Sequence, residues 1–136
     1  MNREDQEEVF RICQNDDVAF PLVMAIIEHE SQFDPSARSI TGDSGLMQIN
    51  DVNAESLAEQ GFTDLYDLHD NVSAGVYMLQ ELYCKYEDTT FVLMAYNAGE
   101  KGAKEQQEEG ITETDYTNEI ESRAEVFTEY IDERLK

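Results

Sequence analysis

An acidic residue closes an apolar helical stretch in the first quarter of the chain. The spacing i, i+3, i+4, i+7 places four side chains on one face of a helix, those of Val23, Ile26, Ile27 and Glu30. A helix with this face must pack against other elements, which carries the carboxyl group of Glu30 toward the interior. Because burying an ionised carboxylate is costly, such a group keeps its proton to higher pH. The pattern predicts a packed helical protein and a group suited to act as a general acid near neutrality.

The residues after Glu30 form motifs in a fixed order. Taken alone, Glu30 could equally lie at a fraying helix end with its head group in water. It opens, however, a first motif that consists of Glu30, Ser31, Phe33, Pro35, Ala37 and Ser39. A second motif reads Gly-Leu-Met-Gln-Ile at residues 45–49, and an Asn-x-x-Ala-Gly-x-x-x-Leu segment begins at Asn71. Ala-Tyr-Asn-Ala-Gly follows at residues 95–99, and a weaker Gly-Ile-Thr segment at residues 110–112 precedes Tyr116.

These motifs resemble those of the soluble lytic transglycosylase family, lysozyme-like enzymes that cleave the glycan strands of peptidoglycan. The resemblance implies a mainly α-helical, lysozyme-like fold, close to goose-type lysozyme, with at most a small β element. We expect one such catalytic domain over residues 1–136. The implied activity is that of a carbon–oxygen lyase, which cleaves the β-1,4 bond between N-acetylmuramic acid and N-acetylglucosamine and leaves a 1,6-anhydro product.

The resemblance gives Glu30 both steps of this reaction. Glu30 would protonate the leaving oxygen and then accept a proton from the C6 hydroxyl of N-acetylmuramic acid, which attacks C1 without water. Ser31 is expected to support the acid, or simply to brace the helix end. The residues that the resemblance places against the substrate are Ser39, Thr41, Met47, Gln48, Tyr96, Asn97 and Tyr116. For Met47, plain core packing is the alternative.

Two other functions remain open from the sequence. A hydrolytic muramidase or chitinase would need a second carboxylate to activate water, and Asp43 and Asp34 are the candidates. Asp34 precedes a proline and suits a turn, while goose-type lysozymes carry an Asp where this chain has Asn50, which argues against hydrolysis. The other is a glycan-binding module without activity, against which the retained Glu30, Tyr96 and Gln48 argue.

Charge and composition limit the partners. With 31 acidic and nine basic residues, a net charge of −22 argues against nucleic acid and anionic membranes, which demand basic patches. We expect peptidoglycan glycan strands as partner, a monomer, no cofactor, no metal ion and no membrane insertion. The first residues lack the basic and apolar parts of a signal peptide. Action at the cell wall would then imply a trimmed mature form, a part of a longer parent, or a phage or mobile-element product delivered by other means.

Periodicity predicts an all-helical chain with one fixed loop. Helices are expected over residues 5–15, 21–32, 53–60, 71–86, 90–97 and 114–135. The loop over residues 34–45 should be well fixed and could supply the small β element. Cys13 and Cys84 allow either one disulfide or two free thiols. His69 and the aspartates near it do not match an EF-hand, so a solvated turn and a helix start explain them better.

Overall fold

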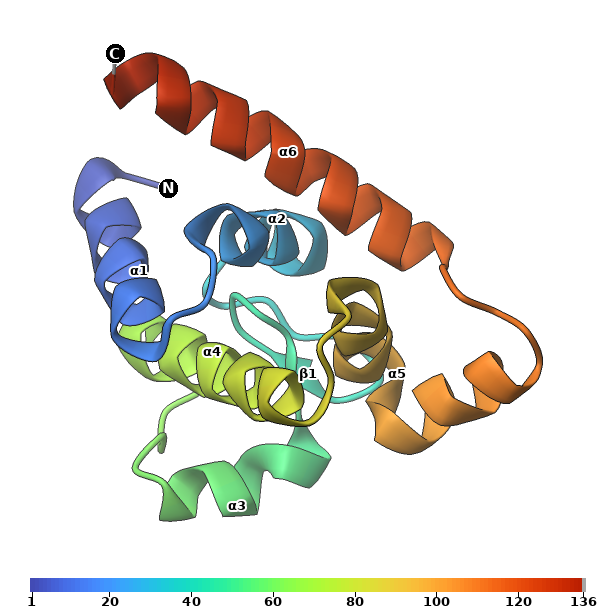
Figure 1. Ribbon diagram of the computed structural model, residues 1–136. Helices are drawn as coiled ribbons and strands as arrows, with labels where there is room; N and C mark the ends of the chain where they lie inside the picture. Colours follow the sequence, from blue (N-terminus) through green and yellow to red (C-terminus); the bar gives the residue numbers. More distant parts are fainter. Residues whose placement is uncertain (136) are drawn as a thin grey trace.

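The computed structural model describes the backbone of residues 1–135 and the side chains of residues 1–131. Six α-helices surround a short hairpin (Figure 1). In chain order the elements are α1 (Arg3–Asp16), α2 (Phe20–Ser31), β1 (Asp43–Ser44), β2 (Ile49–Asn50), η1 (Asp51–Asn53), α3 (Ala54–Glu59), α4 (Leu68–Lys85), α5 (Thr89–Glu108) and α6 (Asp115–Leu135). The side chain of Leu135, which the sequence places on the apolar face of the last helix, lies outside the described residues.

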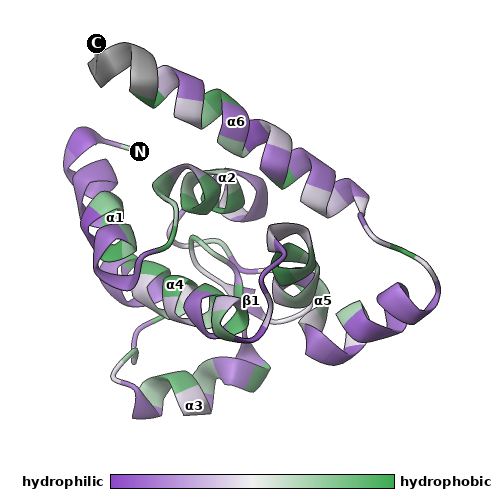
Figure 2. Cartoon of the chain, in the orientation of Figure 1, coloured by the Kyte–Doolittle hydropathy of each residue, from purple (hydrophilic) through white to green (hydrophobic). Residues whose placement is uncertain are grey.

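Helix α2 is the central element of the core. Its first turn carries Pro21, whose fixed backbone angle suits a helix start. The predicted face is confirmed, because Val23, Ile26 and Ile27 are completely buried. Figure 1 shows α2 flanked by α1 and crossed by the long α6, and Figure 2 shows that α2 is largely apolar while α6 is mostly polar. The end of α2, with Glu30, thus lies inside the helical assembly.

The predicted β element is present as a very short hairpin. Strand β1 pairs with β2 in antiparallel register, with Asp43 opposite Asn50 and Ser44 opposite Ile49. The loop that leads to it leaves α2 through Gln32 and Phe33, which both have positive φ angles, of 52° and 65°. Left-handed residues at a helix end turn the chain sharply. This turn sends the chain from Glu30 directly into the loop that carries Asp43.

Contacts with helix α4 hold the Gly-Leu-Met-Gln segment, residues 45–48, in place. The buried side chain of Asn71 accepts from the backbone N–H of Met47 at 2.8 Å and donates to the carbonyl oxygens of Ser44 and Leu65 at 2.8 and 2.7 Å. One turn further along, Gly75 faces the side chain of Met47, and a Cβ at Gly75 would collide with the Met47 sulfur. The two motifs therefore interlock, and the loop is rigid although it is mostly irregular.

The helices otherwise follow the prediction, with one extension. Helix α5 continues to Glu108, past residue 97 where the predicted helix ends, and it bends at Gly99, whose φ is 79°. A positive φ is favourable only for glycine in most settings, so Gly99 permits the bend. Both cysteines are free, Cys13 buried and Cys84 exposed. In the described part of the chain, no helix has the length and apolarity that a membrane crossing requires.

Candidate functional site

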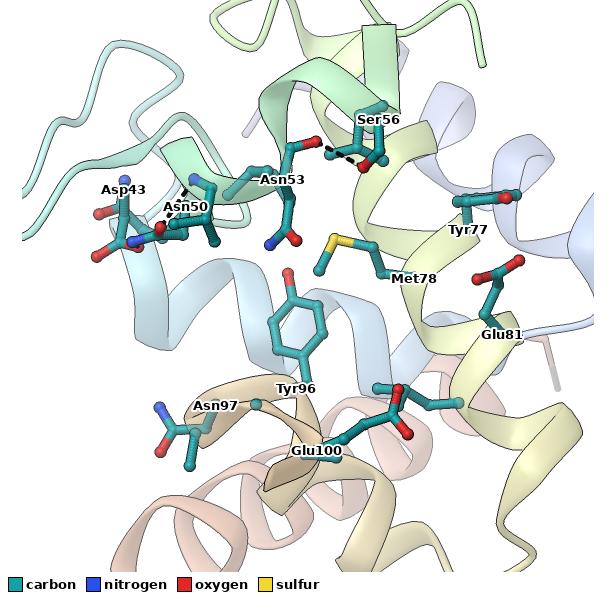
Figure 3. Close-up of a pocket in the computed structure, with 18 of the residues that line it drawn as sticks. Asp43, Asn50, Asn53, Ser56, Tyr77, Met78, Glu81, Tyr96, Asn97 and Glu100 are labelled. Atoms are coloured by element: carbon teal, nitrogen blue, oxygen red, sulfur yellow. Dashed lines mark hydrogen bonds between the residues drawn. The ribbon is translucent and has the colours of Figure 1, made fainter. Parts of the chain in front are cut away.

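A cleft of about 530 Å³ opens between the hairpin and the helices α3, α4 and α5. Figure 3 shows Tyr96 in the middle of this cleft, with Asp43 and Asn50 on one side and Tyr77 and Glu81 on the other. The lining residues are Glu30, Asp43, Gln48, Ile49, Asn50, Val52, Asn53, Ser56, Leu57, Tyr77, Met78, Glu81, Leu82, Lys85, Ala95, Tyr96, Asn97, Ala98, Gly99 and Glu100. Concave sites with a few convergent polar groups are the usual binding sites of proteins.

Glu30 contributes a carboxyl group with an altered acidity to this cleft. Burial raises the pKa of Glu30 from 4.5 to about 7, because the charged form loses solvation there. The charge of His29 acts to lower this pKa, and the negative charge of Asp43 acts to raise it. The net result is a carboxyl group that holds its proton near neutrality, as the sequence predicts for an acid on an apolar helical face.

Asp43 is another carboxyl group that lines the cleft, and its surroundings are polar. Its Oδ2 accepts from the hydroxyls of Ser39 and Thr41, both at 2.7 Å, and its Oδ1 accepts from Asn50 Nδ2 at 2.9 Å. Partial burial acts to raise the pKa of Asp43, but these three hydrogen bonds and the nearby charge of Arg38 outweigh it and lower the pKa. Asp43 therefore stays ionised where Glu30 does not.

Two tyrosines lie close to Glu30. The hydroxyl of Tyr96 donates to the carbonyl oxygen of Met47 at 2.9 Å, so its proton is held by the backbone and not by Glu30. Burial and the charges of Tyr116, Glu30 and Asp43 raise the pKa of Tyr96 well above its usual value. The hydroxyl of Tyr116 is buried and finds no hydrogen-bond partner among the described residues. Burial, and then the charge of Glu30, raise the pKa of Tyr116 as well. Both rings stay neutral.

Some of the residues that the resemblance assigns to substrate contacts line the cleft, and the others do not. Gln48, Tyr96 and Asn97 line the cleft, and Gln48 also donates to the carbonyl oxygens of Gly45 and Ala37 at 2.9 and 3.2 Å. Met47 is completely buried, so its side chain packs in the core and does not line the cleft. Ser31 is buried and donates to the Ile27 carbonyl oxygen at 3.0 Å, which braces the end of α2.

Ser39, Thr41 and Tyr116 are not lining residues of this cleft. The hydroxyls of Ser39 and Thr41 donate hydrogen bonds to Asp43, which itself lines the cleft. The rings of Tyr116 and His29 pack edge to face, with centroids 5.1 Å apart. The sequence motifs do not include the distal wall of the cleft, which consists of Asn53, Ser56, Tyr77, Met78, Glu81, Lys85 and Glu100. The pairing of Tyr77 with Glu81 one helical turn later, beside an otherwise apolar α4 face, is the one sequence feature that hints at it.

The aspartates near His69 serve the start of α4. Asp67 caps the helix by accepting from the Asp70 N–H at 3.1 Å, and Asp70 accepts from the N–H groups of Thr63 and Asp64 at 3.2 and 3.0 Å. This is the turn and helix start that the sequence favours. In the part of the chain that the structure describes, no group of three or more His, Cys, Asp or Glu side chains could hold a metal ion.

Known proteins resemble this chain in sequence and in fold. The membrane-bound lytic murein transglycosylase F of Desulfosudis oleivorans is 41% identical over 85 residues, which cover 57% of this chain and 18% of that protein. The transglycosylase of Enterobacteria phage PRD1 is 36% identical over 78 residues, 57% of this chain and 28% of the phage protein. This chain thus spans less than a third of the length of either relative.

Two solved structures share the fold at 20% identity. An inactive mutant of the lytic transglycosylase Slt of Pseudomonas aeruginosa has a TM-score of 0.81 over 93% of this chain and 24% of its own. The 70 kDa soluble lytic transglycosylase of Escherichia coli has a TM-score of 0.78 over 92% and 24%. They confirm the expected mainly α-helical, lysozyme-like fold. Because the model of the transglycosylase SLT domain matches residues 8–118, this chain belongs to the transglycosylase SLT domain family.

Proposed function

We propose that this chain is a peptidoglycan lytic transglycosylase in which Glu30 acts first as general acid and then as general base. The observation that carries the proposal is the place of Glu30. Its carboxyl group lines an open cleft, and burial raises its pKa to about 7. A catalytic acid works best when its pKa lies near the operating pH, because it is then protonated yet still able to release the proton. The names of the relatives agree with this chemistry.

The reaction uses one enzyme proton and returns it. Glu30 gives its proton to the glycosidic oxygen while the bond between C1 and that oxygen breaks, and the electron pair stays with the departing oxygen. The C6 hydroxyl of the same N-acetylmuramic acid then attacks C1 and closes the 1,6-anhydro ring. Its proton passes to the Glu30 carboxylate, which restores the acid for the next cycle. Since the attacking hydroxyl belongs to the substrate, proximity replaces an activated water.

The walls of the cleft supply the contacts for the glycan. Gln48 and Asn97 present amide groups, and Tyr96 presents an aromatic ring, which are suited to hydroxyls, N-acetyl groups and sugar faces. That these three residues bind the sugar stays a prediction, as does a contact from Tyr116. We propose glycan strands as the partner and the cell wall as the place of action.

Digestion of purified peptidoglycan tests the proposal. Products released by the parent protein should be lighter by one water than hydrolytic products when analysed by mass spectrometry. The Glu30→Gln variant should release none, because the glutamine amide is too weak an acid to protonate the leaving oxygen. Glu105→Gln, the same change at an exposed position of α5, should match the parent. Products of full mass would make the chain a muramidase. Glycan binding without any release by the parent would make it a binding module.

A further inference from the structure

We propose that Asp43 is a second catalytic carboxylate of this site, which offsets the positive charge that develops on the sugar as the glycosidic bond breaks. Asp43 lines the same cleft as Glu30 and belongs to a different element, the first strand of the hairpin. The inference rests on the proposed role of Glu30, because the charge on the sugar arises only when Glu30 has protonated the leaving oxygen. It goes further, because the proposed mechanism needs only the carboxyl group of Glu30, and Asp43 is a further carboxyl group of the same cleft.

Asp43 is built to remain an anion. Each of its carboxylate oxygens accepts a hydrogen bond, Oδ2 from the hydroxyls of Ser39 and Thr41 and Oδ1 from the amide of Asn50. The Ser39 oxygen in turn accepts from the backbone N–H of Asp43 at 3.0 Å, which directs the Ser39 hydroxyl proton toward the carboxylate. A carboxylate that receives several hydrogen bonds is stabilised in its charged form. Ser39, Thr41 and Asn50 are therefore positioning residues for Asp43.

Glu30 and Asp43 differ in protonation, as a proton donor and a stabilising anion must. Glu30 has an apolar environment that keeps its proton, and Asp43 has polar neighbours that remove its own. Environments that push the acidities of two neighbouring carboxyl groups apart assign one as the acid and the other as the charge stabiliser. The negative charge of Asp43 also helps Glu30 to remain protonated. Asp34 cannot share this role, because its side chain is exposed and accepts from Ser36 within a turn.

The step balances without a new bond to Asp43. Glu30 supplies the proton, the bond between C1 and the leaving oxygen breaks, and the electron pair remains on that oxygen. The resulting positive charge is shared by C1 and the ring oxygen of the sugar. The Asp43 carboxylate lowers the energy of this charge through the field of a fixed anion in the cleft. Attack by the C6 hydroxyl then discharges the cation, its proton passes to Glu30, and Asp43 is unchanged.

A purely structural role for Asp43 would give a different result. Asp43 lies opposite Asn50 in the hairpin, so its hydrogen bonds could serve only to hold two strands together. Asp43→Asn keeps the size of the side chain and removes its charge. If the role is structural, this variant loses stability and keeps its rate per folded molecule. If the role is catalytic, it loses rate while it stays folded. In either case the pKa of Glu30 falls, because a neighbouring negative charge is gone.

The experiment compares the parent with Asp43→Asn, Asp34→Asn and Glu30→Gln. We expect Asp43→Asn to release muropeptides about 100-fold more slowly, with a thermal unfolding midpoint close to that of the parent. The Glu30 carboxyl pKa, followed by carbon NMR without substrate, should drop. Asp34→Asn, the same change outside the cleft, should keep the parental rate. A parental rate for Asp43→Asn beside an inactive Glu30→Gln would overturn the inference and leave the proposed function intact, whereas an inactive parent would overturn the proposed function itself.

A second variant tests the proposal if Asp43→Asn fails to fold. Ser39→Ala removes one of the two hydroxyl donors to Asp43 Oδ2 and leaves the carboxylate in place. We expect a smaller loss of rate, about tenfold, because one charge-assisted hydrogen bond less leaves Asp43 less well positioned. The Glu30 pKa should stay near the parental value, since the charge of Asp43 remains. A Ser39→Ala variant with the full parental rate would contradict the proposal in that case.

Discussion

The side-chain carbonyl of the buried Asn71 accepts a hydrogen bond from the backbone N–H of Met47 at 2.8 Å, and this contact joins helix α4 to the loop behind the cleft. Asn71→Asp would keep the shape but lose the N–H groups that bind the carbonyl oxygens of Ser44 and Leu65. A buried carboxylate would then face two oxygens. We expect a loss of more than about 2 kcal/mol in the free energy of unfolding.

Urea unfolding measures this loss, and Asn118→Asp serves as its control. Asn118 lies exposed on α6, so the same change adds the same charge without removing a buried hydrogen bond. Its effect should stay within about 0.5 kcal/mol. If both variants were equally stable, the bridge from Asn71 to the loop would contribute nothing to the fold.

The space at Gly75 leads to a second prediction. Gly75→Ala would place a methyl group against the Met47 side chain, which is completely buried. Overpacking of this kind costs about 1–3 kcal/mol. Gly102→Ala is the matched control, because a Cβ there would meet only Ala98, at 3.3 Å, and alanine favours a helix. Thermal unfolding should therefore show a lower midpoint for Gly75→Ala and an equal or higher one for Gly102→Ala.

Much of this fold is readable from the sequence because helices repeat. The spacing of Val23, Ile26, Ile27 and Glu30 predicts both a buried face and an acid with a raised pKa, and the structure shows both. The extension of α5 beyond residue 97 is not readable in this way, since it depends on a bend at Gly99 and not on a continuous apolar face. Helical periodicity predicts which face of a helix is buried, but it does not predict that a helix continues after a bend.

The site is harder to predict, because its contacts run through an irregular loop. The motif assigns substrate contacts to Ser39 and Thr41, which stays a prediction, and it does not show that their hydroxyls bind Asp43. That arrangement depends on backbone turns that no periodic pattern specifies. The distal wall with Tyr77 and Glu81 depends on how α4 packs beneath the hairpin, which is tertiary information. Sequence reasoning thus finds Glu30 and several other lining residues, namely Asp43, Gln48, Tyr96 and Asn97, and does not find the distal wall.

A third prediction concerns the hydroxyl of Tyr96. Tyr96→Phe would leave the carbonyl oxygen of Met47 without its hydrogen bond of 2.9 Å and would keep the ring in the cleft. Loss of one partly buried hydrogen bond costs about 1 kcal/mol. Tyr66→Phe removes the contacts of a more exposed hydroxyl with Ser44, at 3.3 Å, and with Arg38, and should cost less. Denaturant midpoints compare the two variants, and equal midpoints would show that the Tyr96 hydroxyl does not stabilise the loop.

The raised pKa of Glu30 predicts the alkaline limit of activity. The acid works only in its protonated form, so the rate should fall by half near pH 7 and tenfold for each further pH unit. Initial rates of glycan cleavage between pH 5 and pH 9 measure this limb. Glu109→Gln, an exposed change, should leave the limb in place. A limb near pH 5 would show that burial does not protect the proton of Glu30.

The same group makes stability depend on pH with a definite sign. Between about pH 4.5 and pH 7 the unfolded chain loses the Glu30 proton and the folded chain keeps it, so the folded state binds more protons and stability falls as pH rises. Glu30→Gln removes this dependence. At pH 8 it should therefore gain about 3 kcal/mol relative to the parent, compared with the difference at pH 4. Urea unfolding of both proteins at the two pH values measures the gain. A constant difference would mean that Glu30 has an ordinary pKa in the folded protein, and that the acid of this site must be sought elsewhere.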